Sequence, residues 1–305
     1  MKIIHVDVDA ALDVYLDGTT YDMSLEGYLK ENSGEGIEGL TIKTGCSADK
    51  NTLSRFPDLK LLITRTVGID HIDLEYCKQK GIAVYRIVDY GAFNIAEHTF
   101  ALMLAGTRHL LDSWSEVQQG RFTYQGHLGF ALRDKTIGVI GTGRIGREVI
   151  HIAHGFNMKI IAHDQEHHHE SIKKYGYRYV EMDELLAQSD VITLHAPLTD
   201  ETRHMIDDAA IMKMKQGVVL INTARGGLVD TVALIKHIER FRFVGLDVIE
   251  GEDTFSAEHP LLKQENVLIT PHMAFYSDAS VKKIAEETER LIKLYESGST
   301  EERVV

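Results

Sequence analysis

Three apolar runs in the second half of the chain are each followed by a side chain that can do chemistry. Arg225 comes after VVLINT, and His272 comes after NVLIT and one proline, while Asp247, Glu250 and Glu252 stand at or just past the end of FVGLDV. A guanidinium can hold a carboxylate with two hydrogen bonds at any relevant pH. An imidazole can donate or accept a proton near neutral pH, and a carboxylate beside it fixes its orientation and favours its protonated form. These residue types predict a site that binds an anionic substrate and protonates it.

A glycine-rich stretch, TIGVIGTGRIGREV, predicts a dinucleotide site. Gly141, Gly143 and Gly146 form the pattern G-x-G-x-x-G between a strand-like run and a predicted helix over 145–154. The first glycine permits a tight turn, the second lets a diphosphate approach, and the third lets helix and strand pack closely. The diphosphate would lie at the helix N-terminus. Asp164 ends the next apolar run, where a carboxylate binds ribose hydroxyls and repels a 2'-phosphate, so we expect NAD rather than NADP.

The elements that must position these residues are short apolar runs rich in Val and Ile, alternating with amphipathic stretches of helix length. Continuous apolar runs suit strands that are covered on both faces, and their alternation with helices predicts open parallel sheets. Ligands bind beyond the carboxyl ends of such strands, where the chemical residues stand. The predicted strands are 2–8, 38–44, 59–65, 81–87, 136–141, 158–164, 190–196, 217–223, 243–248 and 266–270.

So many strands predict two α/β domains. A long predicted helix over 94–120 marks the change from the first to the second, and an amphipathic helix over 278–298 is expected to return to the first. We therefore expect a substrate domain of residues 1–95 completed by 277–305, and a nucleotide-binding domain of residues 96–276.

Composition limits the possible functions. The chain has 305 residues and a formal net charge of -13, which argues against binding to nucleic acid or to anionic membranes. No apolar run reaches the length of a membrane span and the N-terminus has no signal-like pattern. Cys46 and Cys77 lack metal-type spacing, so we expect no metal site and a cytoplasmic location. The histidine-rich segment 163–170 is interpreted as a solvated loop.

Several motifs, taken in order, resemble the NAD-dependent D-2-hydroxyacid dehydrogenases. The likeness runs from Leu61 to Tyr276 and is weakest over residues 1–60. Within the family the sequence PHMAFY is most similar to the D-lactate and D-2-hydroxyisocaproate dehydrogenase branch, since phosphoglycerate dehydrogenases have small residues after the histidine. The matching stretches are TRTVGIDHIDL (64–74), DYGAFNIAEHTFALMLA (89–105), GVIGTGRIGREV (138–149), DVITLHAPLTDETRHMID (190–207), MKQGVVLINTARGGLVD (214–230), GLDVIEGE (245–252) and ITPHMAFY (269–276).

The resemblance implies a Rossmann domain inserted in a flavodoxin-like domain, and a role for each matching residue. Arg225, Glu252 and His272 would be the catalytic trio. The substrate carboxylate would meet the N–H groups of Val67 and Gly68 together with Arg225, and Tyr90 and Tyr276 would line the substrate cavity. Implied cofactor contacts are Arg144 and Ile145 at the diphosphate, Asp164 at the ribose, Ala196, Pro197 and Thr202 around the adenosine, and Thr223, Ala224 and Asp247 near the nicotinamide.

Two of these assignments have alternatives. Asp247 could instead cap backbone groups at its strand end, and Glu250, to which the resemblance gives no role, is interpreted as a solvated turn carboxylate. A second copy of the chain is expected to pair through the helix containing AEHTFALMLA, giving a homodimer.

The expected reaction is the NADH-dependent reduction of a 2-keto acid to a D-2-hydroxy acid, and its reverse, with pyruvate or a slightly larger acid. A hydroxypyruvate or glyoxylate reductase would use the same trio. Formate dehydrogenase is disfavoured because Glu252 stands where those enzymes place a glutamine. An NAD-sensing corepressor is a further alternative, although the sequence shows no appended recognition tail.

Overall fold

The computed structural model describes residues 1–43 and 46–305, and of Asp253 only the backbone. By its contacts the chain divides into two compact units, residues 1–91 with 276–305 (unit 1) and residues 92–275 (unit 2). Each unit is a parallel α/β sheet with helices on both faces, which confirms the predicted fold class. No helix among the described residues is long and apolar enough to span a membrane.

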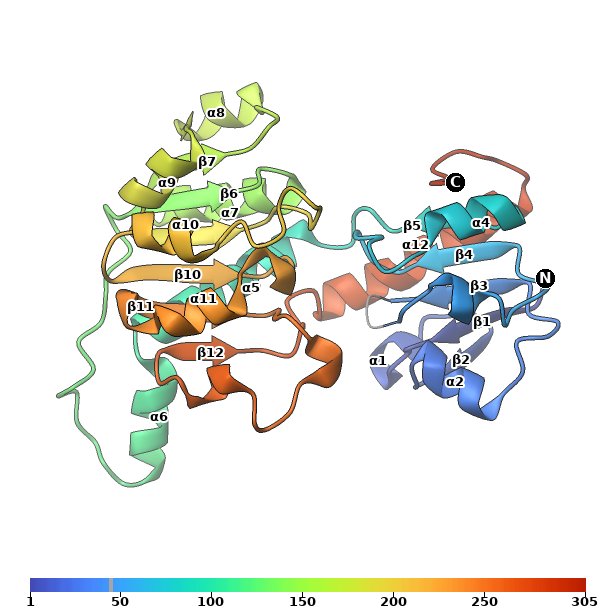
Figure 1. Ribbon diagram of the computed structural model, residues 1–305, viewed down its shortest axis with the longest axis horizontal. Coiled ribbons are helices and arrows are strands. Elements are labelled where there is room, and N and C mark those ends of the chain that lie inside the picture. The colour runs from blue at the N-terminus through green and yellow to red at the C-terminus, as the bar shows by residue number, and fades with distance from the viewer. Residues whose placement is uncertain (44–45) are drawn as a thin grey trace. The chain divides into compact units, whose positions relative to one another are not determined.

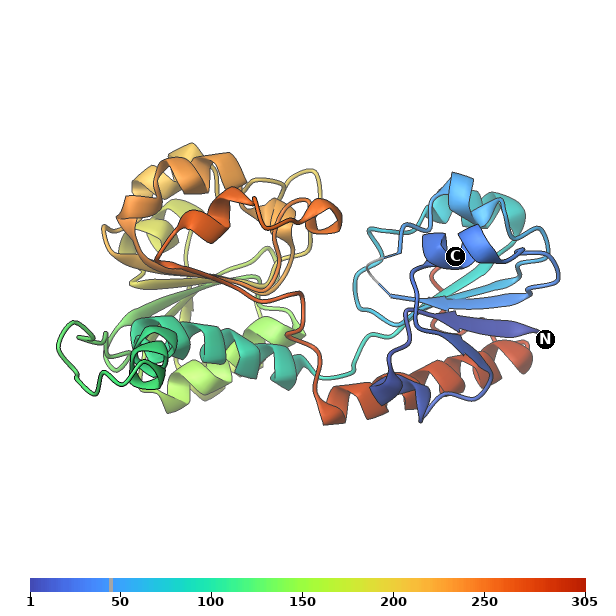
Figure 2. The same cartoon turned by 90° about the horizontal axis from the view of Figure 1, so that it is seen from below.

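Unit 1 contains a five-stranded sheet in the order β2-β1-β3-β4-β5, the flavodoxin-like order. Its strands are β1 (Ile3–Val6), β2 (Thr19–Tyr21), β3 (Gly39–Ile42), β4 (Leu61–Thr64) and β5 (Ala83–Arg86). One face is covered by α2 (Leu25–Glu31), α3 (Lys50–Leu53) and α4 (Leu74–Lys80), and the other by α1 (Ala10–Asp13) and α12 (Asp278–Glu296) (Figure 2). The last residue of the predicted strand 38–44, Thr44, lies outside the described residues.

Unit 2 contains a seven-stranded sheet in the order β12-β11-β10-β9-β6-β7-β8, in which the order reverses between β6 and β9. Its strands are β6 (Thr136–Ile140), β7 (Lys159–His163), β8 (Arg178–Tyr179), β9 (Val191–Leu194), β10 (Val218–Asn222), β11 (Phe241–Leu246) and β12 (Val267–Ile269). This is the Rossmann arrangement with an additional strand at one edge, and folds of this kind bind a dinucleotide at the point of reversal.

Helices cover both faces of this sheet, which is why its strands are continuously apolar (Figure 2). One face packs against α5 (Ala92–Thr107) and α7 (Arg144–Gly155), and the other against α9 (Met182–Gln188), α10 (Asp208–Lys213) and α11 (Thr231–Lys236). The remaining elements are α6 (Leu110–Gln118), α8 (His169–Tyr175) and short 3-10 turns at Gly226–Leu228, Ile238–Arg240, Glu252–Thr254 and Pro260–Lys263.

Two expectations about the elements were wrong. The single helix predicted over 94–120 is broken after Thr107, because His109 adopts a left-handed backbone with φ of +50° and the chain restarts as α6. The strands β2 and β8 were not predicted, since TTY and RY are too short and too polar to stand out as apolar runs.

Candidate active site

The glycine-rich turn between β6 and α7 has the geometry that its spacing predicts. Gly141 has φ of +88°, and a Cβ there would lie 2.6 Å from the backbone N of Ala196. A Cβ on Gly146 would lie 2.0 Å from the carbonyl oxygen of Gly141, so the helix packs directly on the turn. Gly143 has open space around its Cβ position. The turn is therefore closed on the protein side and open where a diphosphate would approach.

Asp164 follows β7 and is connected to the same turn. Its Oδ2 accepts hydrogen bonds from the N–H of Thr142 at 2.5 Å and from the Thr142 hydroxyl at 3.0 Å, and its Oδ1 accepts one from the N–H of Glu166 at 3.1 Å. Burial by itself raises the pKa of Asp164, but these hydrogen bonds lower the pKa overall below its ordinary value. A charged carboxylate is therefore fixed beside the glycine-rich turn, as a ribose ligand requires.

The histidine-rich segment after Asp164 is mostly exposed, as expected of a solvated loop, but two of its side chains are ordered against the fold. His167 stacks on Tyr179 with the ring centroids 3.9 Å apart, and Nε2 of His168 lies 3.0 Å from Nη1 of Arg147. Arg147 also donates to the carbonyl oxygen of Thr142 at 3.0 Å. These contacts support the turn that holds Asp164.

The other predicted cofactor residues stand at the carboxyl edge of the same sheet. Gly143 and Arg144 are exposed and Ile145 is half-buried at the start of α7. Thr202 donates its hydroxyl to the carbonyl oxygen of Pro197 at 2.7 Å, so it holds the loop after β9, beginning at the buried Ala196.

Thr223 and Ala224 follow β10 and are likewise held by neighbours. The Thr223 hydroxyl lies 2.9 Å from the hydroxyl of Thr99 on α5, and the N–H of Ala224 donates to Oδ1 of Asn222 at 3.0 Å. The structure thus brings the predicted cofactor residues to one edge, while their individual contacts with NAD stay predictions.

His272 and Glu252 form a hydrogen-bonded pair. Nδ1 of His272 lies 2.9 Å from Oε2 of Glu252, although the two residues follow different strands. The N–H of Ile249 donates to the other Glu252 oxygen at 3.3 Å. The His272 and Glu252 side chains are 30% and 39% exposed, so both are accessible to a small molecule. Of the two ring nitrogens, Nε2 is left to exchange a proton with a substrate.

Asp247 anchors the loop that carries His272. Its carboxylate accepts hydrogen bonds from the N–H groups of Met273 and Ala274 at 2.9 and 2.8 Å and from the Thr270 hydroxyl at 2.5 Å, and the residue is 1% exposed. Burial raises the pKa of Asp247, but the hydrogen bonds from His98, Thr270 and the loop lower it overall. This geometry favours the backbone-capping alternative over contact with the nicotinamide.

Arg225 follows β10 and is half-buried. Its Nη1 donates to the carbonyl oxygen of Ala224 at 2.8 Å, while its own carbonyl accepts from Nδ2 of Asn222 at 2.8 Å. Because β10, β11 and β12 are neighbours in the sheet, the loops of Arg225, Glu252 and His272 leave the same edge side by side (Figure 1). The trio predicted from separate motifs therefore belongs to adjacent strand ends.

The predicted substrate residues Val67, Gly68, Tyr90 and Tyr276 lie in unit 1. The carbonyl oxygen of Val67 accepts from Nη1 of Arg86 at 3.2 Å, and that of Gly68 accepts from the Thr66 hydroxyl at 2.8 Å. These two hydrogen bonds fix the orientation of the peptide groups that follow Val67 and Gly68. Their contact with a substrate carboxylate stays a prediction.

Sequence reasoning missed two groups near these loops. Nε2 of His98, on α5, lies 3.0 Å from the Thr270 hydroxyl and 3.5 Å from Oδ1 of Asp247, so His98 supports the His272 loop. Its place in the matching stretch AEHTFALMLA could have indicated this role. His195, at the end of β9, has both ring nitrogens buried without a hydrogen-bond partner among the described residues. Burial lowers the pKa of His195 to about 3, so the ring is neutral.

A Rossmann sheet with a charged acid beside its glycine-rich turn, and with an imidazole, a carboxylate and a guanidinium at its carboxyl edge, is typical of nicotinamide-dependent oxidoreductases. Residues 100–274 match the sequence profile of the D-isomer specific 2-hydroxyacid dehydrogenase, NAD binding domain.

Relatives of known structure and activity agree with this class. The structure of D-lactate dehydrogenase from Aquifex aeolicus, complexed with NAD and lactic acid, is 36% identical, covers 99% of both chains and has a TM-score of 0.88. The structure of D-2-hydroxyisocaproate dehydrogenase is 28% identical, covers 100% of this chain and 99% of its own, and has a TM-score of 0.83. The aromatic 2-oxoacid reductase of Clostridium sporogenes is 36% identical over 87% of this chain and 85% of its own. This chain belongs to the D-2-hydroxyacid dehydrogenase family and is an NAD-dependent oxidoreductase.

Proposed function

We propose that this enzyme reduces a small 2-keto acid to the D-2-hydroxy acid and catalyses the reverse oxidation, with pyruvate or a slightly larger acid as substrate. The observation that carries the proposal is the 2.9 Å contact between His272 and Glu252 on the strand edge that also presents Arg225. NAD, when bound, supplies or accepts the hydride. The open space at Gly143 and the fixed carboxylate of Asp164 fit that cofactor.

Each member of the trio has a separate task in this proposal. Arg225 binds the substrate carboxylate and polarises the carbonyl group, because a planar guanidinium presents paired donors to both. His272 donates a proton from Nε2 to the carbonyl oxygen as negative charge develops there, and takes it back in the reverse direction. Glu252 accepts a hydrogen bond from Nδ1, which fixes the orientation of the ring.

The identity of the keto acid is tested by steady-state oxidation of NADH with pyruvate, hydroxypyruvate, glyoxylate, 2-ketoisocaproate and phenylpyruvate. We expect the highest kcat/KM with pyruvate or 2-ketoisocaproate and formation of the D product. A clear preference for hydroxypyruvate or glyoxylate would replace the proposed substrate. NADH binding without turnover of any of these acids would replace the enzyme with a cofactor-sensing protein.

We propose further that unit 2 binds the cofactor and that unit 1 supplies the substrate domain. Cys46 and Cys77 are both buried free thiols, which suits the reducing cytoplasm and supports that location.

A homodimer is also proposed, but through a different surface from the one expected. The helix AEHTFALMLA is part of α5, whose apolar residues Ala96, Phe100, Leu102 and Met103 are buried within unit 2. Instead, α6 and the segment after it expose a group of large apolar side chains, which we call the arm patch. It consists of Leu110, Leu111, Trp114, Val117, Phe122, Tyr124 and Leu128, of which Trp114 is 63% and Phe122 is 93% exposed.

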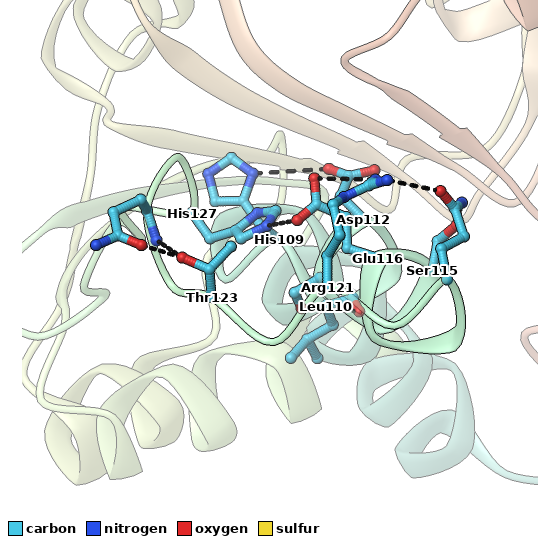
Figure 3. A network of polar contacts seen from close by, with 11 residues as sticks. His109, Leu110, Asp112, Ser115, Glu116, Arg121, Thr123 and His127 are labelled. Atoms are coloured by element: carbon cyan, nitrogen blue, oxygen red, sulfur yellow. Dashed lines mark hydrogen bonds and ion pairs between the residues drawn. The ribbon is translucent and has the colours of Figure 1, made fainter.

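Polar contacts hold the segment of the arm patch against α6 (Figure 3). Nε2 of His127 lies 3.2 Å from Oε2 of Glu116, and the N–H of Arg121 donates to the Glu116 carbonyl at 3.0 Å. His109 lies 3.8 Å from Asp112. So many large exposed apolar side chains within one short stretch of chain are unusual on a monomer and typical of an interface between copies. Light scattering should give a dimer for the wild type and a monomer for Trp114→Ser/Phe122→Ser. Val232→Ser, at a position 77% exposed outside the patch, should remain dimeric.

A further inference from the structure

Glu250 lies on the same loop as Glu252 and contacts the chain that follows Arg225, although the proposed reaction does not use it. Its Oε1 lies 2.6 Å from Nε2 of His204, and its Oε2 accepts a hydrogen bond from the N–H of Thr231 at 3.0 Å. Burial by itself raises the pKa of Glu250, but the bonds from His204 and Thr231 lower it overall. Glu250 is therefore a turn carboxylate with a 30% exposed side chain, as expected, but it is also held by two partners from other loops.

His204 connects Glu250 to the Arg225 loop. Its N–H donates to the carbonyl oxygen of Gly227 at 2.8 Å, while its ring contacts Glu250. The backbone of His204 has φ of +53°, which costs a residue other than glycine some free energy and persists only where neighbours hold it. The loops after β9, β10 and β11 are thus joined through one residue pair.

The loops of Arg225 and Glu252 also touch directly through their backbones. A Cβ on Gly226 would lie 2.0 Å from the carbonyl oxygen of Ile249 and 2.6 Å from the N of Glu250. The N–H of Ile249 in turn donates to Glu252. A shift of Glu250 would therefore move the residues on both sides of this contact, one of which orients Glu252.

We propose that Glu250 and His204 are a positioning pair that sets the place of Arg225 relative to Glu252 and His272. The inference rests on the proposed function, because it assumes that this trio acts on a keto acid. Misplacing a catalytic group by about 1 Å can cost on the order of 10²-fold in rate. The glycine-rich turn and Asp164 lie on other loops, and Thr202 in the His204 loop is held by its own hydrogen bond to Pro197, so we expect the Kd of NADH to change little.

The pair is tested in the full-length enzyme with Glu250→Ala, Glu250→Gln, His204→Asn and the double variant Glu250→Gln/His204→Asn. Asparagine at 204 tolerates the left-handed backbone but does not reach Glu250. We expect Glu250→Ala to lower kcat with the best keto acid by roughly tenfold or more. Glu250→Gln, which retains an oxygen for Thr231, should recover part of the loss. The double variant should be no worse than its worse single variant, because both changes remove one contact.

The pair His237–Asp208 in unit 2 is a matched control. Nε2 of His237 lies 2.8 Å from Oδ1 of Asp208, with Asp208 at the start of α10 and His237 directly after α11. Asp208→Asn/His237→Asn should leave kcat unchanged. For all variants the Kd of NADH by fluorescence and the Tm are measured beside kcat and KM. A positioning role lowers kcat with little change in the Kd of NADH.

Four results would overturn the positioning role. These are a kcat of Glu250→Ala within twofold of the wild type, a loss confined to Tm and NADH affinity, equal losses in the control pair, and additive effects in the double variant. A wild type that turns over no keto acid would instead reject the proposed function, and the positioning role with it. The two failures are distinguished because failure of the proposed function is already seen in the wild type, whereas failure of the positioning role is seen only when the variants are compared with an active wild type.

Discussion

Nδ1 of His272 lies 2.9 Å from Oε2 of Glu252, although Glu252 follows β11 and His272 follows β12. Because Glu252 engages Nδ1, the ring presents Nε2 for proton transfer. His272 itself has a left-handed backbone with φ of +51°, and Asp247 holds the residues around it. The predictions below depend on this arrangement.

Replacing His272 with alanine should lower kcat by roughly 10²-fold or more, because the general acid is lost. Glu252→Gln should lower kcat less, since an amide oxygen can still accept a hydrogen bond from Nδ1, although a weaker one than a carboxylate accepts. Both are measured by steady-state NADH oxidation, with the Kd of NADH as the control for folding. Near-normal turnover of folded His272→Ala would show that another group donates the proton.

Arg225→Lys should be a poor enzyme despite the retained charge. A lysine ammonium is a point charge and does not reproduce the paired donors of a guanidinium. We expect the KM for the keto acid to rise and kcat to fall together, while NADH affinity stays within a few-fold of the wild type. A variant with wild-type kcat/KM would remove Arg225 from the substrate site.

Asp164→Ala should weaken the preference for NADH over NADPH. In its predicted role the carboxylate would bind ribose hydroxyls and repel a 2'-phosphate, and the alanine variant would do neither. The ratio of kcat/KM for the two cofactors gives the result. Glu166→Ala, which removes a neighbouring exposed carboxylate but not the ribose ligand, is the control. An unchanged ratio in Asp164→Ala would contradict the role of this residue.

Acid should destabilise both units through one buried histidine in each. Burial, and then the charge of Arg65, lowers the pKa of His5 to about 4, and burial lowers the pKa of His195 to about 3, from about 6.5. The unfolded chain takes up these protons first, so their contribution is full above pH 6.5 and is lost as the pH falls toward 4 and 3. Each should cost about 1.4 kcal/mol of unfolding free energy per pH unit in its window.

Urea unfolding followed by circular dichroism between pH 7 and 4.5 measures this effect. His195→Gln should show a smaller dependence of the unfolding free energy on pH than the wild type. An identical slope in the variant and the wild type would mean that His195 is protonated in the folded state.

The two cysteine thiols should resist alkylation in the native enzyme. Burial, followed by the nearby charge of Asp7, raises the pKa of Cys46 to about 12, and burial raises that of Cys77 to about 11. Because the thiolate is the reactive species, iodoacetamide at pH 8 should modify native protein at least on the order of 10²-fold more slowly than unfolded protein. Mass spectrometry of quenched samples gives both rates. Comparable rates would show that one thiol is accessible and ionised.

The sequence by itself determined the fold class and the candidate trio. Apolar runs such as 217–223 and 266–270 identify buried parallel strands because local hydrophobicity determines which segments are covered on both faces. The glycine spacing at 141–146 indicates the cofactor turn, since only glycine permits those close approaches. Arg225 and His272 were found because each follows a strand, where parallel sheets present their ligands, whereas the family resemblance selected Glu252 from the three acidic residues Asp247, Glu250 and Glu252.

Only the tertiary structure decided how neighbouring loops support one another. The burial of Asp247 under residues 273–274, the contact of His204 with Glu250, and the burial of the apolar face of α5 within unit 2 all join residues distant in sequence. Residue type and spacing report local propensity, whereas these contacts depend on the order of β9 to β12 in the sheet. The break at His109, which creates α6 and exposes the arm patch, likewise follows from a backbone conformation that residue type alone does not specify.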